Sequence, residues 1–444
     1  MAGRHEKYSE YQESFVDWLG KVPAGWDIKP CRAIVRNMVE KNEGALDQNY
    51  LSLMANVGVI LYEDKGDVGN KKPDDLSKCK IVKKGNLVIN SMNYSIGSYG
   101  MSEYDGVCSP VYIVLDPDEN VVHSRFALRI FENSPFQKYL ATFGNGILAH
   151  RAAIGWDDIK GAYIPVPPKE EQLSILKFLD HETAKIDTLI DKQQQLIKLL
   201  KEKRQAVISH AVTKGLNPAA PMKDSGVEWL GEVPEGWVVR RLKHAAKLQS
   251  GIPKGKDLTG KNTIEVPMLR VANVQDGYLS LDDIHSIKIE PHELDRYELQ
   301  NGDVLMNEGG DNDKLGRGAV WRDEIRPCIH QNHVFAIRPE TIEPEWLDIL
   351  TRASYAKFYF YSVAKQSTNL ASISSTNIKE TPLLIPPKVE RAEIISFLTT
   401  QFNRFDLLET KANLQVKLLH ERRTALISAA VTGKIDVRNW QPAG

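Results

Sequence analysis

The sequence Pro-Pro-Lys-Glu-Glu at positions 167–171 lies near the start of the stretch that decides the fold, because the chain repeats this stretch. Residues 164–213 align without gaps on residues 383–432, 219 positions later, with 21 identities. Both copies carry Pro-Pro-Lys near their start and close with Ala-Val-Thr. Two unrelated helices rich in Leu and Lys would not share both ends, so the chain is predicted to be a tandem duplication.

A second repeated segment precedes each of two divergent regions. Residues 17–26 read Asp-Trp-Leu-Gly-Lys-Val-Pro-Ala-Gly-Trp, and residues 228–237 read Glu-Trp-Leu-Gly-Glu-Val-Pro-Glu-Gly-Trp. The copy that should follow the second helical block lies instead at the start of the chain. The repeat is therefore circular, which predicts an approximate twofold axis with the two termini close together.

The divergent regions align only in fragments. Residues 85–90 match 302–307, and residues 111–117 loosely match 333–339. Short β-rich runs alternate with turn signals in both regions, which predicts two mixed α/β domains of similar size. The fold class is therefore predicted to be α+β.

The two repeated blocks are predicted to be long helices. With heptad position a at 176, apolar residues occupy 8 of 11 seam positions in the first helix and 9 of 11 in the second. Each run would span on the order of 65 Å if wholly helical. Two matching helices are expected to pack on each other. The alternative, that each helix packs only on its own neighbouring domain, stays open here.

Composition limits the classes of function. The chain has 444 residues, 57 Lys and Arg against 58 Asp and Glu, and a net charge of −1, which excludes a globally basic protein but permits local DNA-binding surfaces. The four cysteines form no Cys-x-x-Cys motif, so no zinc ribbon is expected. No apolar run is long enough for a membrane span and no secretory segment is evident, so a cytoplasmic protein is expected.

Catalytic motifs are expected to be absent. Residues 251–256 resemble a phosphate-binding loop, but the glycine spacing is one residue short and Asp257 follows where Ser or Thr should bind magnesium. Residues 181–185 begin like a zinc-protease helix, but Lys185 replaces the second histidine. We expect no enzymatic activity and no cofactor in this chain.

Polar and basic residues on the predicted loops are candidates for DNA contact. Arg and Lys recognise guanine, Asn and Gln recognise adenine, and cations also bind phosphates. The candidates are Lys71, Lys72, Asn90, Asn93, Tyr94, Arg151, Arg270, Asn273, Gln275, Lys314, Arg317, Gln331, Asn332, His333, Lys365, Gln366 and Asn369. For any single candidate, ordinary surface solvation is the competing explanation. His330 and His333 resemble a metal pair, but no third ligand is evident nearby.

The duplicated Trp-Leu-Gly-x-Val-Pro-x-Gly-Trp and Pro-Pro-Lys-x-Glu motifs closely resemble the specificity subunits of type I restriction–modification systems. The Phe-Leu pairs and Asp187 or Asp406 inside the helices, and the closing Ala-Val-Thr, also resemble that family. The resemblance covers essentially the whole chain. It implies two target-recognition domains joined by two helices that pack as an antiparallel coiled coil. The expected segments are 1–22, which completes the circular repeat, 23–165, 166–233, 234–385 and 386–444.

The same resemblance implies the function. Each recognition domain is expected to read one half of a bipartite double-stranded DNA target, and the coiled coil is expected to set the gap. The expected partners are two copies of a modification subunit and, where present, two restriction subunits, which would supply S-adenosylmethionine, ATP and Mg²⁺ chemistry. Base contacts do not transfer from the family, because the recognition domains vary most.

Three alternatives stay open at this stage. The chain could be a coiled-coil scaffold that binds proteins rather than DNA, the specificity subunit of a modification-only system, or an enzyme that acts alone. The missing catalytic motifs weigh against the last of these.

Overall fold

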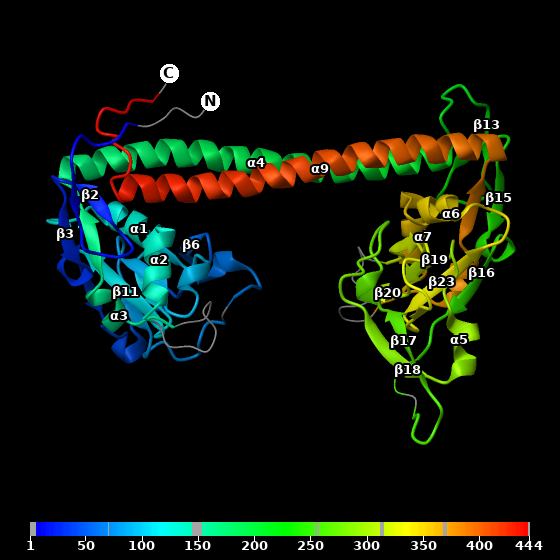
Figure 1. Ribbon diagram of the computed structural model, residues 1–444, viewed down its shortest axis with the longest axis horizontal. Helices are drawn as coiled ribbons and strands as arrows, with labels where there is room; N and C mark the ends of the chain where they lie inside the picture. The colour runs from blue at the N-terminus through cyan, green and yellow to red at the C-terminus, as the bar shows by residue number, and fades with distance from the viewer. Residues whose placement is uncertain are drawn as a thin grey trace. The chain divides into compact units, whose positions relative to one another are not determined.

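A computed structural model describes residues 6–69, 71–143, 153–253, 255, 257–310, 315–366 and 371–442 (Figure 1). The chain divides into two compact units. Unit 1 contains Met1–Gln194 and Leu414–Gly444, and unit 2 contains Gln195–Asn413. Each long helix contributes to both units, a division that the five sequence segments did not anticipate.

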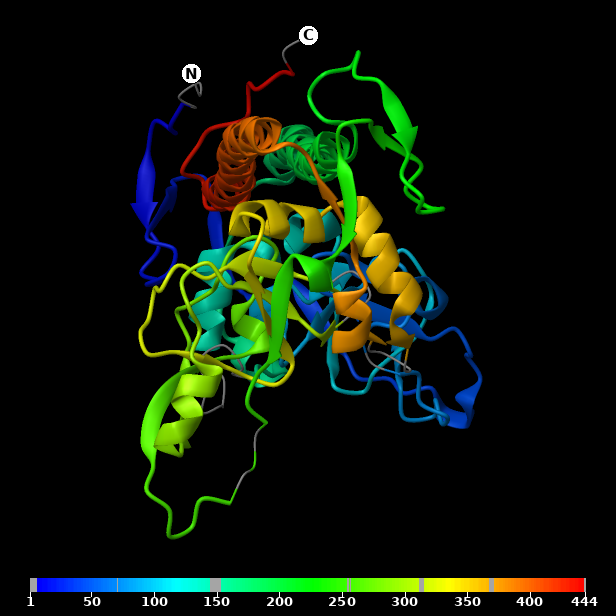
Figure 2. The same ribbon diagram turned by 90° about the vertical axis from the view of Figure 1, so that its right-hand side faces the viewer.

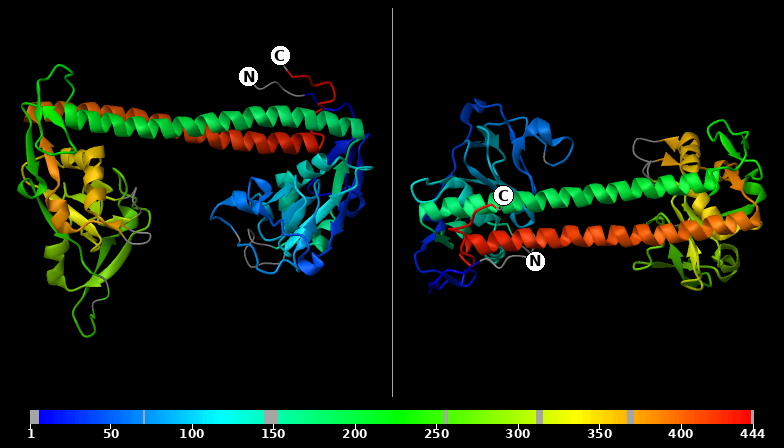
Figure 3. Two further views of the ribbon diagram at one scale, coloured as in Figure 1. Left: turned by 180° about the vertical axis from the view of Figure 1, so that it is seen from behind. Right: turned by 90° about the horizontal axis from the view of Figure 1, so that it is seen from above.

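The two long helices are α4, Lys169–Lys214, and α9, Lys388–Val431. Each begins directly after its Pro-Pro pair, where proline cannot continue the preceding strand. In unit 1 the start of α4 shares a core with the end of α9, and in unit 2 the end of α4 shares a core with the start of α9. The helices therefore lie side by side and antiparallel, as predicted (Figure 3). Within the described residues, no helix is both long and apolar enough to cross a membrane.

Unit 1 is built on a four-stranded antiparallel sheet of order β4-β11-β8-β9, and helices α1 and α2 share its core. These strands are β4 (Val35–Met38), β11 (Tyr112–Pro117), β8 (Leu87–Asn90) and β9 (Tyr99–Met101), and the helices are α1 (Ser124–Glu132) and α2 (Ser134–Ala141). Smaller elements complete the unit: β3 (Asp27–Pro30) with β12 (Tyr163–Val166), β5 (Leu51–Met54) with β6 (Gly58–Leu61), β7 (Lys80–Val82) with β10 (Gly106–Cys108), and α3 (Trp156–Lys160).

Unit 2 repeats this arrangement with a sheet of order β16-β23-β19-β21, and helices α6 and α7 lie between the sheet and the two long helices (Figures 1 and 2). The repeated elements are β16 (Ala246–Ser250), β23 (Val334–Pro339), β19 (Val304–Asn307), β21 (Gly318–Val320), α6 (Pro344–Thr351), α7 (Ser354–Val363), and β15 (Val238–Arg241) with β26 (Pro382–Ile385). Helix α8 (Ser375–Lys379) repeats α3 at the 219-residue offset. The additional elements are β18 (His285–Ile289), β17 (Ile264–Leu269), β22 (Ile329–His330), β20 (Gly309–Gly310), β25 (Ala371–Ser372), β24 (Lys365–Gln366) and α5 (Pro291–Tyr297).

The strand registers confirm the fragmentary alignment of the divergent regions. Asn90 at the end of β8 lies opposite Tyr112, and Asn307 at the end of β19 lies opposite Val334. The two central strand pairs therefore match residue for residue, although their surroundings differ. The α+β tandem repeat predicted from the sequence is the observed architecture.

A buried tryptophan in each unit explains the closing Gly-Trp of the repeated segment. Trp26 is 2% exposed and its Nε1–H donates to Oε1 of Glu171, in the first turn of α4, at 3.0 Å. Trp237 is 1% exposed and its Nε1–H donates to Oε2 of Glu390, in the first turn of α9, at 3.0 Å. Each repeated segment therefore anchors the start of the helix that follows its recognition domain.

The end of the antiparallel helix meets the same tryptophan. After α4, Gly215 has a φ of +74° and faces Trp237, and after α9, Gly433 has a φ of +70° and faces Trp26. A Cβ at Gly433 would lie 2.3 Å from the Pro23 ring, so this position requires glycine for space as well as for its positive φ. Each unit thus joins a hairpin, one helix start and one helix end at a single point.

The hairpin at the start of the chain completes unit 1. Strands β1 (Tyr11–Glu13) and β2 (Lys21–Pro23) pair in the same register as β13 (Met222–Asp224) and β14 (Glu232–Pro234) of unit 2. The Asp436 N–H donates to the Glu6 carbonyl at 2.8 Å, so segments near the two ends of the chain lie together. This confirms the circular repeat predicted from the sequence.

We expect Trp26→Phe to destabilise the chain by about 1–3 kcal/mol or more, because the buried Glu171 carboxylate loses an N–H donor. The control is Trp229→Phe, since Trp229 is 43% exposed and phenylalanine keeps an aromatic ring against Tyr359. Urea unfolding followed by circular dichroism measures both variants. An equal or larger loss for Trp229→Phe would contradict the role of the buried hydrogen bond.

Candidate nucleic-acid interface

In unit 2 the backbone brings several predicted DNA-contacting loops to one edge of the central sheet. The Glu308 N–H donates to the His333 carbonyl at 2.9 Å, and the Asn307 N–H donates to the Arg317 carbonyl at 2.9 Å. The Gln331 N–H donates to the Leu269 carbonyl at 2.9 Å, which adds the turn that follows β17. We name as the polar edge of unit 2 the residues 270–278, 307–310, 315–317, 331–333 and 365–366.

Most described candidates of unit 2 reach solvent at this edge. His333, Lys365 and Gln366 are exposed, and Arg270, Gln275, Arg317, Gln331 and Asn332 are half-buried. Strand β24, which carries Lys365 and Gln366, joins the edge because β25 pairs with both β24 and β20. The structure thus brings together eight candidates that the sequence spreads over almost 100 residues.

Two of these groups, the Arg270 guanidinium and the His333 imidazole, have acidic neighbours. The Arg270 guanidinium donates to Oδ2 of Asp283 at 2.9 Å and lies 3.3 Å from Nδ1 of His285. Nδ1 of His333 lies 2.6 Å from Oε2 of Glu308. These carboxylates hold the side chains in place, and DNA phosphates or base edges would have to compete with them for the same donors.

Asn273 is a correction to the list of candidates. It is only 3% exposed, its amide donates to the carbonyls of Ser280 and Asp283 at 2.9 Å, and its Oδ1 accepts from the Arg270 N–H at 2.8 Å. Asn273 therefore shapes the turn and does not present its amide to a base.

Asn307 has a similar role that the sequence reasoning missed. It is 3% exposed and its amide donates to the carbonyl of Val274 at 2.9 Å. The alignment of Asn307 with Asn90 was the sequence signal that could have identified this residue. Both asparagines lie at the end of the corresponding central strand, where turns must be fixed.

In unit 1 the candidates lie around a smaller cavity. Asn90 and Asn93 line a cavity of about 200 Å³ beside β5, together with Ser52 and Ser98. Asn93 is exposed, whereas Asn90 is 8% exposed and its Oδ1 accepts from the Met92 N–H at 3.1 Å. Lys65, which also lines this cavity, was missed by the sequence reasoning, and its ammonium donates to the Val68 carbonyl at 2.6 Å.

Lys71 and Lys72 are exposed on the loop between β6 and β7, and the Lys72 ammonium donates to the Gln48 carbonyl at 3.1 Å. Their exposure agrees with phosphate contact and also with ordinary solvation. Three further candidates, Arg151, Lys314 and Asn369, lie outside the described residues.

Tyr94 is a second correction, because it belongs to the core. It is 3% exposed, its hydroxyl donates to the Phe131 carbonyl at 2.5 Å, and burial raises its pKa well above 10.0. Its ring meets Tyr99 edge to face at 5.6 Å. The ring therefore packs inward from the loop that the sequence had marked for DNA.

His330 and His333, the two histidines considered as a metal pair, have separate partners. His330 is fully buried, its Nδ1 lies 2.7 Å from the Val334 carbonyl, and burial lowers its pKa below 6.5. His333 is directed to Glu308 instead. Among the residues that the structure describes, no three His, Cys, Asp or Glu side chains are grouped to hold a metal ion.

Reciprocal ion pairs hold the two helices together. In unit 1, Nε of Arg423 on α9 lies 3.0 Å from Asp187 on α4. In unit 2, the guanidinium of Arg204 on α4 lies 2.7 Å from Asp406 on α9. Both the arginines and the aspartates are related by the 219-residue offset of the repeat, so each helix donates and accepts one matching pair.

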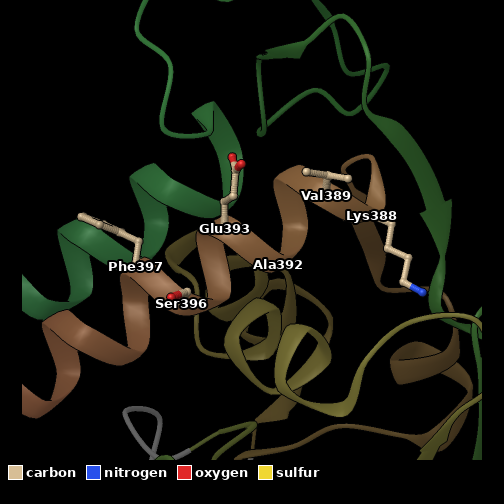
Figure 4. Close-up of a pocket in the computed structure, with 6 residues that line it drawn as sticks. All are labelled: Lys388, Val389, Ala392, Glu393, Ser396 and Phe397. Atoms are coloured by element: carbon tan, nitrogen blue, oxygen red, sulfur yellow. The ribbon is translucent and has the colours of Figure 1, made fainter.

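The helices also expose apolar side chains at matching positions. Leu189 and Leu408 are 46% and 38% exposed, and Leu199 and Leu418 are 60% and 45% exposed. Both pairs are related by the same 219-residue offset. A shallow groove near the start of α9 adds Val389 and Phe397, whose side chains project from the helix in Figure 4. These surfaces suit partners that bind both helices.

Two similar α+β units that share a pair of antiparallel helices, and that present polar residues at their strand ends, define a duplicated recognition protein. The chain belongs to the type I restriction–modification specificity family. Residues 36–199 and 234–418 match the family described as "Type I restriction modification DNA specificity domain".

Curated relatives agree with this membership, and a solved structure shares the fold. The chain is 24% identical over 444 residues to the EcoKI specificity subunit of Escherichia coli strain K12, covering 95% of this chain and 91% of the relative. It is 22% identical over 436 residues to the StySPI specificity subunit of Salmonella potsdam, with the same coverage. A chain from a solved structure titled for the assembly and conformational transition of the type I R-M system has a TM-score of 0.69 at 16% identity. That match covers 92% of this chain and 98% of the other.

One buried carboxyl in unit 2 gives a pH-dependent prediction. Burial raises the pKa of Asp348 from 3.8 to about 6, and Arg352, 3.3 Å away, only partly offsets this rise. The folded chain therefore keeps a proton that the unfolded chain releases, so this group's stabilising contribution is complete below about pH 4 and is lost as the pH rises through about 6.

We therefore expect the thermal stability of the wild type relative to Asp348→Asn to fall between about pH 4 and about pH 6, and to stay level above about pH 7. Thermal unfolding across this range measures the difference. Asp295→Asn, at an exposed carboxyl on α5, is the matched control and should show no such step. A level difference for Asp348→Asn would contradict the raised pKa.

Proposed function

We propose that this chain gives a type I restriction–modification complex its DNA sequence specificity, with each unit reading one half of a bipartite double-stranded target. The observation that carries the proposal is the duplicated central sheet, with the same strand order and matching registers in both units. The divergence of the surrounding loops supports different half-sites for the two units, because base edges are read by side chains on such loops.

The antiparallel helices would set the unread gap between the half-sites. Helices α4 and α9 are each shared between the two units, and the Arg423–Asp187 and Arg204–Asp406 pairs support one fixed register. Charged pairs between helices favour one pairing over slipped alternatives. A fixed register implies a gap of fixed length.

The chain would act as a targeting subunit without catalysis of its own. Two modification subunits would bind the matching leucine surfaces of α4 and α9, since equivalent surfaces suit two copies of one partner. S-adenosylmethionine would be bound by the modification subunits, and ATP and Mg²⁺ by restriction subunits where these are present. We place the complex in the cytoplasm, where its DNA target is available.

The test is to express the chain with its modification subunit in cells that lack adenine methylation and to sequence the methylated sites. A two-part motif with an unread gap supports the proposal. A continuous motif, or no methylation with a correctly assembled complex, overturns it. If the complex binds no DNA at any salt concentration, the protein-binding scaffold is favoured. Methylation by the chain alone would favour an enzyme that acts without partners.

The helices allow a direct test of the gap. Insertion of one helical turn, about four residues, into both α4 after Gln194 and α9 after Asn413 should lengthen each helix by about 6 Å. We expect the unread gap to grow by about two base pairs, since bases are spaced about 3.4 Å apart along each strand. The half-sites should stay unchanged. The matched control is the same insertion in the loop around exposed Gly260, which should leave the gap unaltered.

A further inference from the structure

Arg352 occupies a buried position between the recognition domain of unit 2 and the long helices. It caps the end of α6, its side chain is 9% exposed, and its Nη1 lies 3.3 Å from Oδ2 of Asp348. Its guanidinium carbon lies 5.1 Å from the centre of the Phe402 ring on α9. Arg204 of α4 lies over the same ring at 5.1 Å. A charged group so deeply buried must be held by several partners.

The backbone of Arg352 also contacts α4. Its carbonyl accepts from Nε2 of Gln205 at 2.8 Å, and the next helix is tied in the same way, because Oγ of Ser209 accepts from the Ser354 N–H at 2.9 Å. Arg352 therefore contacts both long helices, one through its carbonyl and one through its guanidinium.

The other side of the guanidinium meets the turn between Val271 and Leu279, which we name the recognition turn. Nε of Arg352 donates to Oδ1 of Asp276 at 3.1 Å. A Cβ on Gly277 would lie 2.6 Å from the guanidinium, so the turn's backbone lies directly against this group. This turn carries Gln275 and follows Arg270, both at the polar edge.

The recognition turn is fixed to the rest of the polar edge by its backbone. The Gly277 N–H donates to the Gly318 carbonyl at 2.8 Å, next to Arg317, and the Asn307 amide donates to the Val274 carbonyl at 2.9 Å. Lys357 of α7 adds a second link, since its ammonium lies 3.5 Å from Oδ2 of Asp276. A displacement of Asp276 would therefore move several candidate base-reading side chains together.

We propose that Arg352 is a positioning residue that couples the recognition turn to α4 and α9, and thereby determines the specificity of the half-site read by unit 2. This inference rests on the proposed function and adds a specificity residue that does not itself touch DNA. The guanidinium suits the role, because it donates to Asp276 and Asp348 while its carbon lies over the Phe402 ring.

Unit 1 has a different connection and serves as an internal reference. Its hairpin β5–β6 lines a cleft of about 610 Å³, together with Glu132, Asp187 and Arg423. Arg423 spans Glu132 at 2.7 Å and Asp187 at 3.0 Å. Changes at Arg352 should therefore leave recognition by unit 1 unaltered.

The test uses the full chain in its complex with the modification subunit and compares three single variants. Arg352→Lys keeps the charge but loses the planar contact, and Asp276→Ala removes the link at a carboxyl that is 43% exposed. Asp295→Ala on α5 is the matched control, at an exposed carboxyl in the same unit. Methylated sites are sequenced for each, and the melting temperature of each purified complex is measured.

We expect Arg352→Lys and Asp276→Ala each to reduce discrimination by about tenfold at base pairs of the unit 2 half-site only. The unit 1 half-site and the gap should stay as in the wild type. The double variant should be no worse than the stronger single variant, because both remove one link. Asp295→Ala should match the wild type.

Three outcomes are distinguishable. An unchanged motif in both link variants overturns the positioning role of Arg352 while leaving the proposed function intact. Equal loss of both half-sites with a lowered melting temperature also overturns it, since that pattern indicates a purely structural role. A wild-type complex without a two-part motif is instead the failure of the proposed function.

Discussion

The hydrogen bond from a buried indole to a glutamate carboxylate, present once in each unit, is the contact on which the architecture depends. Trp26 and Trp237 bind Glu171 and Glu390, which lie in the first turns of the long helices. A carboxylate is favourable there because unpaired N–H groups and the helix dipole make the start of a helix electropositive. The contact therefore fixes where the strand before each Pro-Pro pair leaves its domain and the long helix begins.

The same contact explains why the repeat is circular. A helix that starts at one tryptophan ends at the other, because Gly215 faces Trp237 and Gly433 faces Trp26. Each unit therefore needs a hairpin next to the helix end that it contains. For α9 that hairpin is β1–β2, and the Tyr11 hydroxyl donates to the Gly433 carbonyl at 3.0 Å. The repeat is therefore circular because each long helix starts in one unit and ends in the other.

The features that were predictable from the sequence are those that recur in both halves. The helices, their antiparallel pairing and the matched strand ends at Asn90 and Asn307 all leave a periodic or duplicated signal. The candidate site was predictable only in outline. The polar edge of unit 2 forms through backbone bonds between loops far apart in sequence, and composition does not encode which side chains turn inward. Tyr94 and Asn273 were misassigned for that reason, since a core tyrosine and a turn-building asparagine have the same residue types as DNA contacts.

Arg352 and Asn307 were missed for a related reason. A single arginine at the end of a helix has no pattern that separates a solvated cation from a buried one, and only the packing on Phe402 and Gly277 makes the difference visible. Buried polar groups that hold a turn in place are specific to one unit, so the duplication does not reveal them. The contacts of Arg352 with Asp276 and Phe402 are therefore among those that a comparison of the two halves does not reveal.

The near-neutral charge of the chain agrees with the pairing of basic and acidic side chains at the polar edge. At the polar edge Arg270 is paired with Asp283, and His333 with Glu308, so these groups are oriented before DNA arrives and must exchange these carboxylates for phosphates or base edges. Such an edge favours discrimination between sequences over general attraction to the DNA backbone, because phosphate contacts supply affinity while base-edge contacts supply sequence information. Under the proposed function, partner subunits would supply much of the phosphate binding. A targeting subunit built in this way would search little DNA alone and would read sequence only within the assembled complex.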